Sequence, residues 1–330
     1  MERRHFLASL SAAAMASQLP LRARADAPSA RADAHSAGAD APPAGSGRIT
    51  LLHTNDTHSR IEPFGPGNGA ISGLGGVARR ATLVKQLRQQ LGAVLLLDAG
   101  DTFQGTPYFN RYKGRLDYQL MRMVGYDAGT LGNHDFDNGV GMLVEAMESM
   151  EKLQHANPPF AFVNCNFDFK GAPSLSKRVR PYLVKAFPGL RVGITGVGVA
   201  FAGLVAPKNH EGIVWKDPYD SLKPIVKRLR EVEKVDLVVV LSHLGYNLNG
   251  SAPDDLQMPG QVAGIDAIIG GHSHTFLDKP TKVPQARGET LVFQVGFGGV
   301  NLGRMDFAVA RGAVRAASGS AMPVMGSIVT

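Results

Sequence analysis

The sequence predicts an α/β fold, in which buried strands alternate with amphipathic helices. Short apolar runs of three to five residues recur along the chain from Arg48, and stretches with helical periodicity separate several of them. Alternation of this kind is typical of layered domains whose sheets are covered by helices. The chain has no internal repeat and no second linker, so one domain is expected over residues 47–330.

The apolar runs and the periodic stretches define the expected elements in order. The expected strands are 49–52, 93–97, 160–163, 192–195, 237–241, 267–269 and 291–293, with one more near Thr130. The expected helices are 75–91, 116–124, 140–153 and 221–233. Continuous apolar runs, rather than a strict alternation with polar residues, indicate strands that are buried on both faces.

Composition excludes several classes of protein. The chain has 330 residues, 44% hydrophobic and 19% charged, which excludes a collagen-like or wholly disordered chain. Cys165 is its one cysteine, so no intramolecular disulfide forms. Residues 1–25 carry +3 of the formal charge of +7, and the remaining +4 suits a small anionic substrate. The basic residues form no block with interleaved aromatic residues, so nucleic-acid binding is not expected.

The N-terminus has the parts of an export signal over residues 1–25. A basic start with Arg3 and Arg4 precedes a short apolar run at 8–16 and an A-x-A site that ends at Ala25. Paired arginines followed by x-Phe-Leu resemble the twin-arginine signal, although an ordinary basic leader is the alternative. The apolar run is shorter than the roughly 20 residues of a membrane span. We therefore expect a periplasmic protein that is not inserted in the membrane after cleavage.

A second segment, residues 26–46, consists almost entirely of Ala, Asp, Pro, Ser, Gly and Arg. It offers no large apolar side chain whose burial would offset the entropy lost on ordering the chain. We expect it to be a flexible linker.

Polar clusters follow five of the expected strands. These clusters are 55–58, 98–101, 132–135, 242–243 and 270–274, and they hold half of the ten histidines. Ligands of open α/β sheets bind outside the carboxyl ends of the strands, so the clusters should meet in one crevice. Nitrogen and oxygen donors without a thiolate favour Mn, Fe, Zn or Co. The sequence therefore predicts a metal site, in which one carboxylate can bridge two cations.

The order and spacing of these motifs resemble a known family. The motifs are Asp56-x-His58, Gly100-Asp101-x-x-Gln104-Gly105, Gly132-Asn133-His134-Asp135, Ser242-His243 and Gly271-His272-Ser273-His274. Together they resemble the five signatures of the calcineurin-like metallophosphoesterases. Residues 52–58, 132–137 and 294–299 resemble the 5'-nucleotidase branch, which also contains UDP-sugar hydrolases. The resemblance implies a four-layer α-β-β-α sandwich of mixed sheets, with two divalent metal ions at the carboxyl ends of the strands.

The resemblance also implies a role for each site residue. Asp56, His58 and His274 would hold the first metal, Asn133, His243 and His272 the second, and Asp101 would bridge them. His134 would face the phosphoryl group and be oriented by Asp137, for which the alternative is a helix N-terminal carboxylate. Asn164 and Asn166 are candidate substrate contacts, with turn formation as the alternative. Two cations about 3.5–4 Å apart would generate a metal-bound hydroxide that attacks phosphorus.

Two departures from the family pattern affect the expected function. Many members of the nucleotidase branch carry Asn or Gln at the position of His274, so a histidine there could alter the metal preference. The nucleotidases also have a C-terminal domain that binds the base, and this sequence ends about where that domain would begin. A separate substrate-binding partner chain is therefore one expectation.

The leading expectation is a 5'-nucleotidase-like phosphomonoesterase that acts on nucleotides or other organic phosphates. The alternatives within the same fold are a cyclic-nucleotide phosphodiesterase, a nucleotide-sugar pyrophosphatase and a thiosulfohydrolase-like enzyme of sulfur oxidation. The last alternative is a metal-binding subunit that needs its partner chain.

Overall fold

The computed structural model describes residues 46–153, 159–286, 288–310 and 312–326. The signal expected over residues 1–25 lies outside this part of the chain, and so does the linker expected over 26–46, apart from Ser46. The N–H of Ser46 donates a hydrogen bond to the carbonyl of Gly189 at 2.9 Å. The first strand begins at the next residue, Gly47.

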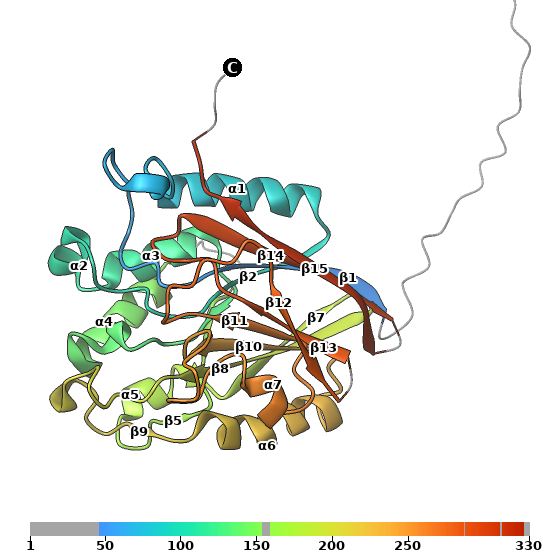
Figure 1. Ribbon diagram of the computed structural model, residues 1–330. Coiled ribbons are helices and arrows are strands. Elements are labelled where there is room, and N and C mark those ends of the chain that lie inside the picture. The colour runs from blue at the N-terminus through green and yellow to red at the C-terminus, as the bar shows by residue number, and fades with distance from the viewer. Residues whose placement is uncertain (1–45, 154–158, 287, 311, 327–330) are drawn as a thin grey trace, which may run out of the picture. The chain divides into compact units, whose positions relative to one another are not determined.

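A mixed sheet contains the first strand of the fold (Figure 1). Its strands, in spatial order, are β15 (Ala313–Pro323), β14 (Asn301–Ala310), β1 (Gly47–Thr54), β2 (Ala93–Asp98), β3 (Ala128–Gly129), β4 (Ala161–Val163) and β6 (Val179–Arg180). β14 pairs antiparallel with β1 and β15, whereas β1, β2, β3, β4 and β6 run parallel. The carboxyl ends of the parallel strands therefore lie at one edge of the sheet.

A second mixed sheet has the order β12 (Thr281–Gln285), β13 (Gly288–Phe293), β11 (Ala267–Gly270), β10 (Leu237–His243), β8 (Leu190–Gly198) and β7 (Tyr182–Phe187). Its four inner strands are parallel, and the strand at each edge is antiparallel to its neighbour. Two short strands, β5 (Phe167–Asp168) and β9 (Val214–Trp215), form a separate antiparallel pair.

Helices cover the outer faces of the sheets. They are α1 (Val77–Gln90), α2 (Pro107–Tyr112), α3 (Arg115–Val124), α4 (Gly139–Glu151), α5 (Pro173–Ser176), α6 (Pro218–Glu231) and α7 (Met258–Gln261). Figure 1 shows α1 above the strands and α6 and α7 below them. None of the helices in the described part of the chain combines the length and the apolar character that a membrane crossing requires.

Helix α6 shows how the sequence sets a boundary and a buried face. The carboxylate of Asp217 accepts a hydrogen bond from the N–H of Asp220 at 2.9 Å, and Pro218 follows as the first helical residue. Leu222, Val226 and Leu229 recur on one side of the helix and are buried. That face packs against the second sheet.

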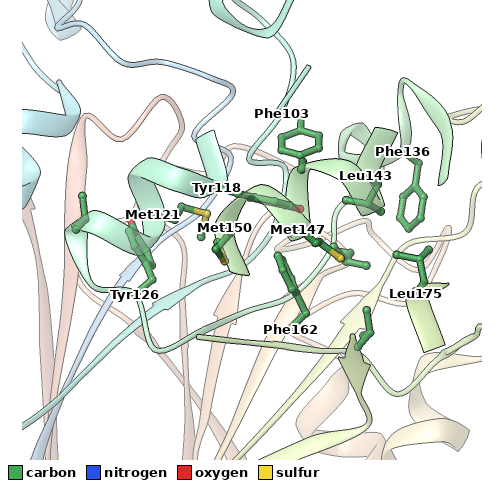
Figure 2. Packing of buried hydrophobic residues seen from close by; sticks show 14 of the residues in the cluster. Phe103, Tyr118, Met121, Tyr126, Phe136, Leu143, Met147, Met150, Phe162 and Leu175 are labelled. Carbon is green, nitrogen blue, oxygen red and sulfur yellow. The ribbon is translucent and has the colours of Figure 1, made fainter. Parts of the chain in front are cut away.

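Side-chain alternation along the strands creates three separate cores. Leu51 belongs to the core between the two sheets, whereas its neighbour Leu52 belongs to the core beneath the helices. In β10, Val239 lies between the sheets and Val240 packs with α6. Figure 2 shows the helix-side core of the first sheet, where Met147 of α4 is among the packed residues. The layers thus run α-β-β-α, and the predicted fold class is confirmed.

The expected strands and helices all occur, with boundaries that differ by a few residues. The sequence reasoning did not identify the β14–β15 hairpin, the edge strands β7 and β12, or the short helices α2, α5 and α7. Strand β15 is rich in Ala, Ser and Gly, which are weak strand formers. Its pairing with β14 along ten residue pairs makes it a strand.

Candidate metal centre

The loops that follow β1 and β2 are joined through their backbones. The N–H of Asp56 donates to the carbonyl of Gly100 at 3.0 Å, and the N–H of His58 donates to the carbonyl of Asp101 at 3.1 Å. These bonds continue the parallel pairing of the two strands beyond their ends. They place Asp56, His58 and Asp101 together at the carboxyl edge of the sheet.

The first ligand group consists of Asp56, His58 and His274, whose candidate donor atoms lie within 4.8 Å of one another. The Nε2 atoms of His58 and His274 are 3.0 Å apart, and Nε2 of His274 is 3.4 Å from Oδ1 of Asp56. Asp56 is fully buried, while the side chain of His274 is 40% exposed. The group is therefore open to solvent on the side of His274.

The second ligand group consists of Asp101, His243 and His272. Nε2 of His243 is 3.1 Å from Oδ2 of Asp101 and 4.0 Å from Oδ1 of Asp56. The backbone N–H of His272 donates to both carboxylate oxygens of Asp56 at 3.1 Å. The two groups are thus adjacent and share contacts through Asp56.

Backbone carbonyls orient two of the histidines. Nδ1 of His58 donates to the carbonyl of Phe103 at 2.9 Å, and Nδ1 of His243 donates to the carbonyl of Ala99 at 2.7 Å. A carbonyl only accepts, so Nδ1 carries the hydrogen in both rings. Nε2 is then the atom that each ring offers to a metal.

Asn133 precedes the turn His134–Phe136, and the N–H of His134 donates to Oδ1 of Asp101 at 2.8 Å. In the part of the chain that the structure describes, the buried Oδ1 of Asn133 has no hydrogen-bond partner. A buried polar atom without a partner is costly, and a cation would satisfy it. Nitrogen and oxygen donors also suit divalent Mn, Fe, Zn or Co. These residues therefore fit a dinuclear site.

The pKa values of the second ligand group also favour a bound cation. Burial by itself raises the pKa of Asp101, but His243 and other nearby histidines hold it below its ordinary value. Although burial lowers the pKa of His243, Asp101 and Asp56 raise it to about 10. Burial lowers the pKa of His272 to about 4 and keeps that ring neutral. The metal-free centre thus holds a proton where a cation would bind.

Strained backbone is concentrated at this centre. Ten non-glycine residues of the described chain have positive φ, and five of them are Asp56, His58, Asp101, His272 and His274. Positive φ is unfavourable for side chains with a Cβ and persists only where the surroundings impose it. The surrounding loops therefore hold these ligands in a fixed geometry.

His134 and Asp137 form a hydrogen-bonded pair beside the ligands. Nδ1 of His134 lies 2.9 Å from Oδ2 of Asp137, and the ring centroids of His134 and His58 are 5.4 Å apart. The hydrogen bond that His134 donates to Asp137 raises the pKa of His134. The backbone carbonyl of Asp137 accepts a hydrogen bond from Asn209 at 2.7 Å, which anchors the backbone of this residue.

Asn164 and Asn166 lie in a turn after β4. Oδ1 of Asn164 accepts from the N–H groups of Asn166 and Phe167. The side-chain amide of Asn166 donates to the carbonyls of Gly198 and Lys216, and its Oδ1 accepts from the N–H of Gly198. For Asn166, which is fully buried, the structure favours the turn-forming alternative over contact with a substrate.

Two residues to which the sequence reasoning gave no role support the ligands. Nε2 of Gln294 donates to the carbonyl of Gly271 at 2.7 Å, and its Oε1 accepts from the N–H of Thr275 at 3.0 Å. It therefore closes the loop that carries His272 and His274. Its position at the end of an apolar run was the available signal.

Asp135 supports the loop of Asp101. One of its carboxylate oxygens accepts from the N–H of Gly132 at 2.8 Å and from the N–H of Asp101 at 3.2 Å. Burial, followed by the charge of Asp101, raises the pKa of Asp135 to about 8.

His53 and Cys165 lie outside the metal centre. His53 is fully buried between sheet residues, and burial lowers its pKa to about 3. Burial raises the pKa of the Cys165 thiol to about 12, which disfavours the reactive thiolate. Neither residue belongs to the two ligand groups.

A cavity of about 250 Å³ opens beside the centre. Ligands His58 and His274 line it together with His134, and other loops complete its wall with Arg60, Phe64, Gln104, Gly105, Phe297 and Gly298. The centre is therefore accessible from one side through this cavity.

Comparisons with known proteins agree with the geometry. Residues 49–276 match the family model of the calcineurin-like phosphoesterases. The chain is 31% identical over 283 residues to the trifunctional nucleotide phosphoesterase protein YfkN of Bacillus subtilis (strain 168), covering 79% of this chain and 18% of that protein. It is 36% identical over 238 residues to the 5'-nucleotidase of Rattus norvegicus, covering 70% of this chain and 39% of that protein.

Solved structures give the same result. The 5'-nucleotidase precursor of Thermus thermophilus is 34% identical and superposes with a TM-score of 0.71, covering 84% of this chain and 54% of that one. The chain thus spans less than two thirds of the length of each of these relatives. The predicted family and enzyme class are confirmed, and the chain belongs to the calcineurin-like phosphoesterase family.

Proposed function

We propose that this chain is a dimetal phosphomonoesterase of the 5'-nucleotidase type. The observation that carries the proposal is that the two ligand groups are adjacent. The His134–Asp137 pair lies beside His58 of the first group, at the open side of the centre. Relatives of this chain that are 5'-nucleotidases support nucleotides as the substrate class.

The residues would divide the work as follows. Asp56, His58 and His274 would hold one cation, Asn133, His243 and His272 would hold the other, and Asp101 would contact both. Two divalent cations supply charge neutralisation at the phosphoryl oxygens and lower the pKa of a water nucleophile. The buried carboxylates and the tautomers fixed at His58 and His243 keep these donors aimed at the centre.

His134 would supply the proton. Its Nδ1 is held by Asp137, which leaves Nε2 to donate to the leaving oxygen of the ester. Because Asp137 raises the pKa of His134, the ring carries its second proton over a wider pH range than a free histidine. General acid catalysis of this kind contributes about 10²- to 10⁴-fold in rate.

Hydrolysis by the purified full chain tests the proposal, followed as phosphate release for AMP and the aryl phosphate and by chromatography of the products for the other substrates. The protein is loaded with Mn²⁺ or Zn²⁺ and offered AMP, a cyclic nucleotide, UDP-glucose and an aryl phosphate. Asp101→Asn removes one ligand and should abolish hydrolysis. Asp127→Asn is the matched control, because Asp127 is also buried but bonds to Leu96 and Arg88 instead of the ligand groups.

Each outcome assigns a function. Turnover of AMP that disappears in Asp101→Asn supports a self-sufficient nucleotidase. Turnover of the aryl ester alone supports a working centre whose nucleotide recognition comes from a separate partner chain. Faster turnover of the cyclic nucleotide or of UDP-glucose would replace the phosphomonoesterase assignment. If none of the four substrates is hydrolysed, the phosphomonoesterase assignment is overturned in favour of the sulfur-ester alternative.

We also propose that the chain is exported to the periplasm through a twin-arginine signal. Arg3 and Arg4, followed by x-Phe6-Leu7, a short apolar run and Ala23-x-Ala25, support this proposal. The test is fractionation of cells that express the chain with Arg3→Lys and Arg4→Lys together. Retention of this variant inside the cell supports the twin-arginine route, and its normal export contradicts it.

A further inference from the structure

The cavity beside the metal centre lies to one side of it. His58 and His274 of the first ligand group line this cavity with His134, but Asp101, His243 and His272 of the second group do not. The scissile phosphoryl group would lie between the two groups. The cavity therefore adjoins the scissile bond on the side of His134, where the leaving oxygen receives its proton.

The volume of the cavity limits what it holds. Pockets for complete small-molecule ligands measure about 300–1,000 Å³. At about 250 Å³, this cavity is smaller than that range. It therefore accommodates the part of a substrate next to the scissile bond, and not a whole nucleotide.

Arg60 is the arginine of the cavity wall, and its guanidinium packs at one end of a series of aromatic rings. The guanidinium carbon lies 4.2 Å from the ring centroid of Phe64. Phe64 meets Phe297 edge to face at 5.9 Å, and Phe297 stacks on the ligand His274 at 5.2 Å. Packed rings thus connect Arg60 with the first ligand group.

The backbone beside Arg60 restricts it further. A Cβ at Gly298 would lie 2.7 Å from the ring of Phe64 and 3.8 Å from Cγ of Arg60. The N–H of Gly298 donates to the carbonyl of the ligand Asp56 at 2.7 Å. Only glycine allows this close approach to Phe64, the ring against which the guanidinium of Arg60 packs.

The charge of Arg60 has no counterpart among the residues that the structure describes. Within residues 46–153, 159–286, 288–310 and 312–326, no carboxylate forms an ion pair with its guanidinium, and its side chain donates no hydrogen bond. Arg88 and Arg178, by contrast, pair with Asp127 and Glu148 at 2.8 and 2.9 Å. An arginine that is always charged and presents a planar fork of donors matches a phosphoryl group.

We propose that Arg60 forms an anion subsite that binds a second phosphoryl group of the substrate, on the leaving-group side of the scissile bond. The substrate class is a phosphoanhydride, such as the terminal phosphate of a nucleoside diphosphate. In its hydrolysis the water oxygen bonds to the terminal phosphorus, the bond to the bridging oxygen breaks, and that oxygen leaves with the nucleoside monophosphate. This proposal rests on the proposed phosphoesterase function.

The first test compares ADP with AMP, because the leaving group of AMP is a neutral nucleoside whereas the leaving group of ADP is an anionic nucleoside monophosphate. We measure kcat/KM for both substrates in the metal-loaded full chain and in Arg60→Gln. In Arg60→Gln, the ratio of kcat/KM for ADP to kcat/KM for AMP should fall about 10- to 100-fold. This is the range expected for a lost hydrogen bond to a charged group. Arg60→Lys keeps the charge without the fork and should restore part of the ratio.

Arg48→Gln is the matched control. Arg48 is exposed at the start of β1, whereas the metal ligands follow the end of that strand. The control should keep the wild-type ratio. An equal loss on both substrates in Arg60→Gln would mean that Arg60 contacts the scissile group itself, and would overturn the proposal. An unchanged ratio would also overturn it.

A binding measurement separates this proposal from the proposed function. Calorimetry measures the affinities of methylenebisphosphonate and methylphosphonate for the metal-loaded wild type and for metal-loaded Arg60→Gln. The two proteins are first shown to have the same thermal unfolding midpoint. Loss of the bisphosphonate preference in the variant supports the subsite even where AMP and ADP are not hydrolysed. An equal preference in both proteins contradicts the subsite even where both nucleotides are hydrolysed.

Discussion

The side-chain amide of Gln294 donates a hydrogen bond to the carbonyl of Gly271 at 2.7 Å, directly before the histidines that belong to the two ligand groups. Its oxygen accepts from the N–H of Thr275, directly after them. One fully buried side chain therefore spans a loop that contributes a histidine to each ligand group. Positive φ at both histidines shows that the loop conformation is imposed on it.

Gln294→Leu should lower the affinity for divalent metal by about 10- to 100-fold, as is usual when groups that orient metal ligands are lost. The reason is that the loop loses both of its side-chain anchors while the ligands themselves remain. Calorimetric titration with Mn²⁺ measures the affinity, and excess metal should restore activity.

Gln285→Leu is the matched control for this prediction. Gln285 also bridges two backbone groups, since it donates to the carbonyl of Ile265 at 2.7 Å and accepts from the N–H of Gly264 at 3.0 Å. It lies outside the ligand groups. Both variants should lose stability, but Gln285→Leu should bind Mn²⁺ as the wild type does. Equal metal affinity in the two variants would refute the positioning role of Gln294.

Metal binding should release protons and tighten as the pH rises. In the metal-free centre Asp101 and Asp56 raise the pKa of His243 to about 10, so this ring is protonated at pH 7. A histidine must be neutral to bind a metal, so binding expels that proton. Calorimetry in two buffers of different ionisation enthalpy measures the number of protons released. Binding of Mn²⁺ with no proton release, and with equal affinity at pH 6 and pH 8, would contradict this prediction.

Asp137→Asn should move the basic limb of the pH profile to lower pH. The hydrogen bond that His134 donates to Asp137 raises the pKa of His134, and an amide at position 137 no longer favours the protonated ring. Because the acid form of His134 is the active one, activity is lost as the pH rises through this pKa. The variant should therefore lose activity at a lower pH than the wild type, as measured by kcat/KM against pH. An unshifted limb with a uniformly lower rate would show that Asp137 has only a structural role.

His53 should make the fold sensitive to acid. Its ring lies edge-on to Phe293, with centroids 5.1 Å apart, and both ring nitrogens are buried without a partner among the described residues. Burial lowers its pKa from 6.5 to about 3. Between these two pH values the unfolded chain binds a proton at His53 and the folded chain does not. Stability is therefore lost as the pH falls below about 6.5, by about 2 kcal/mol at pH 5.

His53→Leu removes this proton uptake and should reduce the loss of stability between pH 7 and pH 5 by that amount. Urea unfolding of metal-free protein at the two pH values measures it in wild type and variant. The comparison is made without metal, because metal binding itself depends on pH and would add its own contribution to the measured stability. The same loss in both proteins would show that His53 is not the acid-sensitive group.

Local sequence determined the framework of this protein. The continuous apolar runs of β1, β2, β10 and β11 predicted strands that are buried on both faces, and these strands form the parallel centres of two sheets. The helical periodicity of α6 predicted its buried face. Polar residues at the strand ends predicted a metal site, and Asp56, Asp101 and His243 lie together in the fold. These features follow from side-chain periodicity and from strand direction, which are properties of short segments.

Tertiary structure decided the rest. Strand β15 exists because β14 pairs with it, and Asn166 is held in a turn by β8. Gln294 reaches Gly271, and Arg60 and Phe297 line one cavity although they are far apart in the chain. The sequence contains each of these residues, but no periodic pattern relates them. Their contacts depend on which loops meet at the edge of the sheets, and only the packed layers bring those loops together.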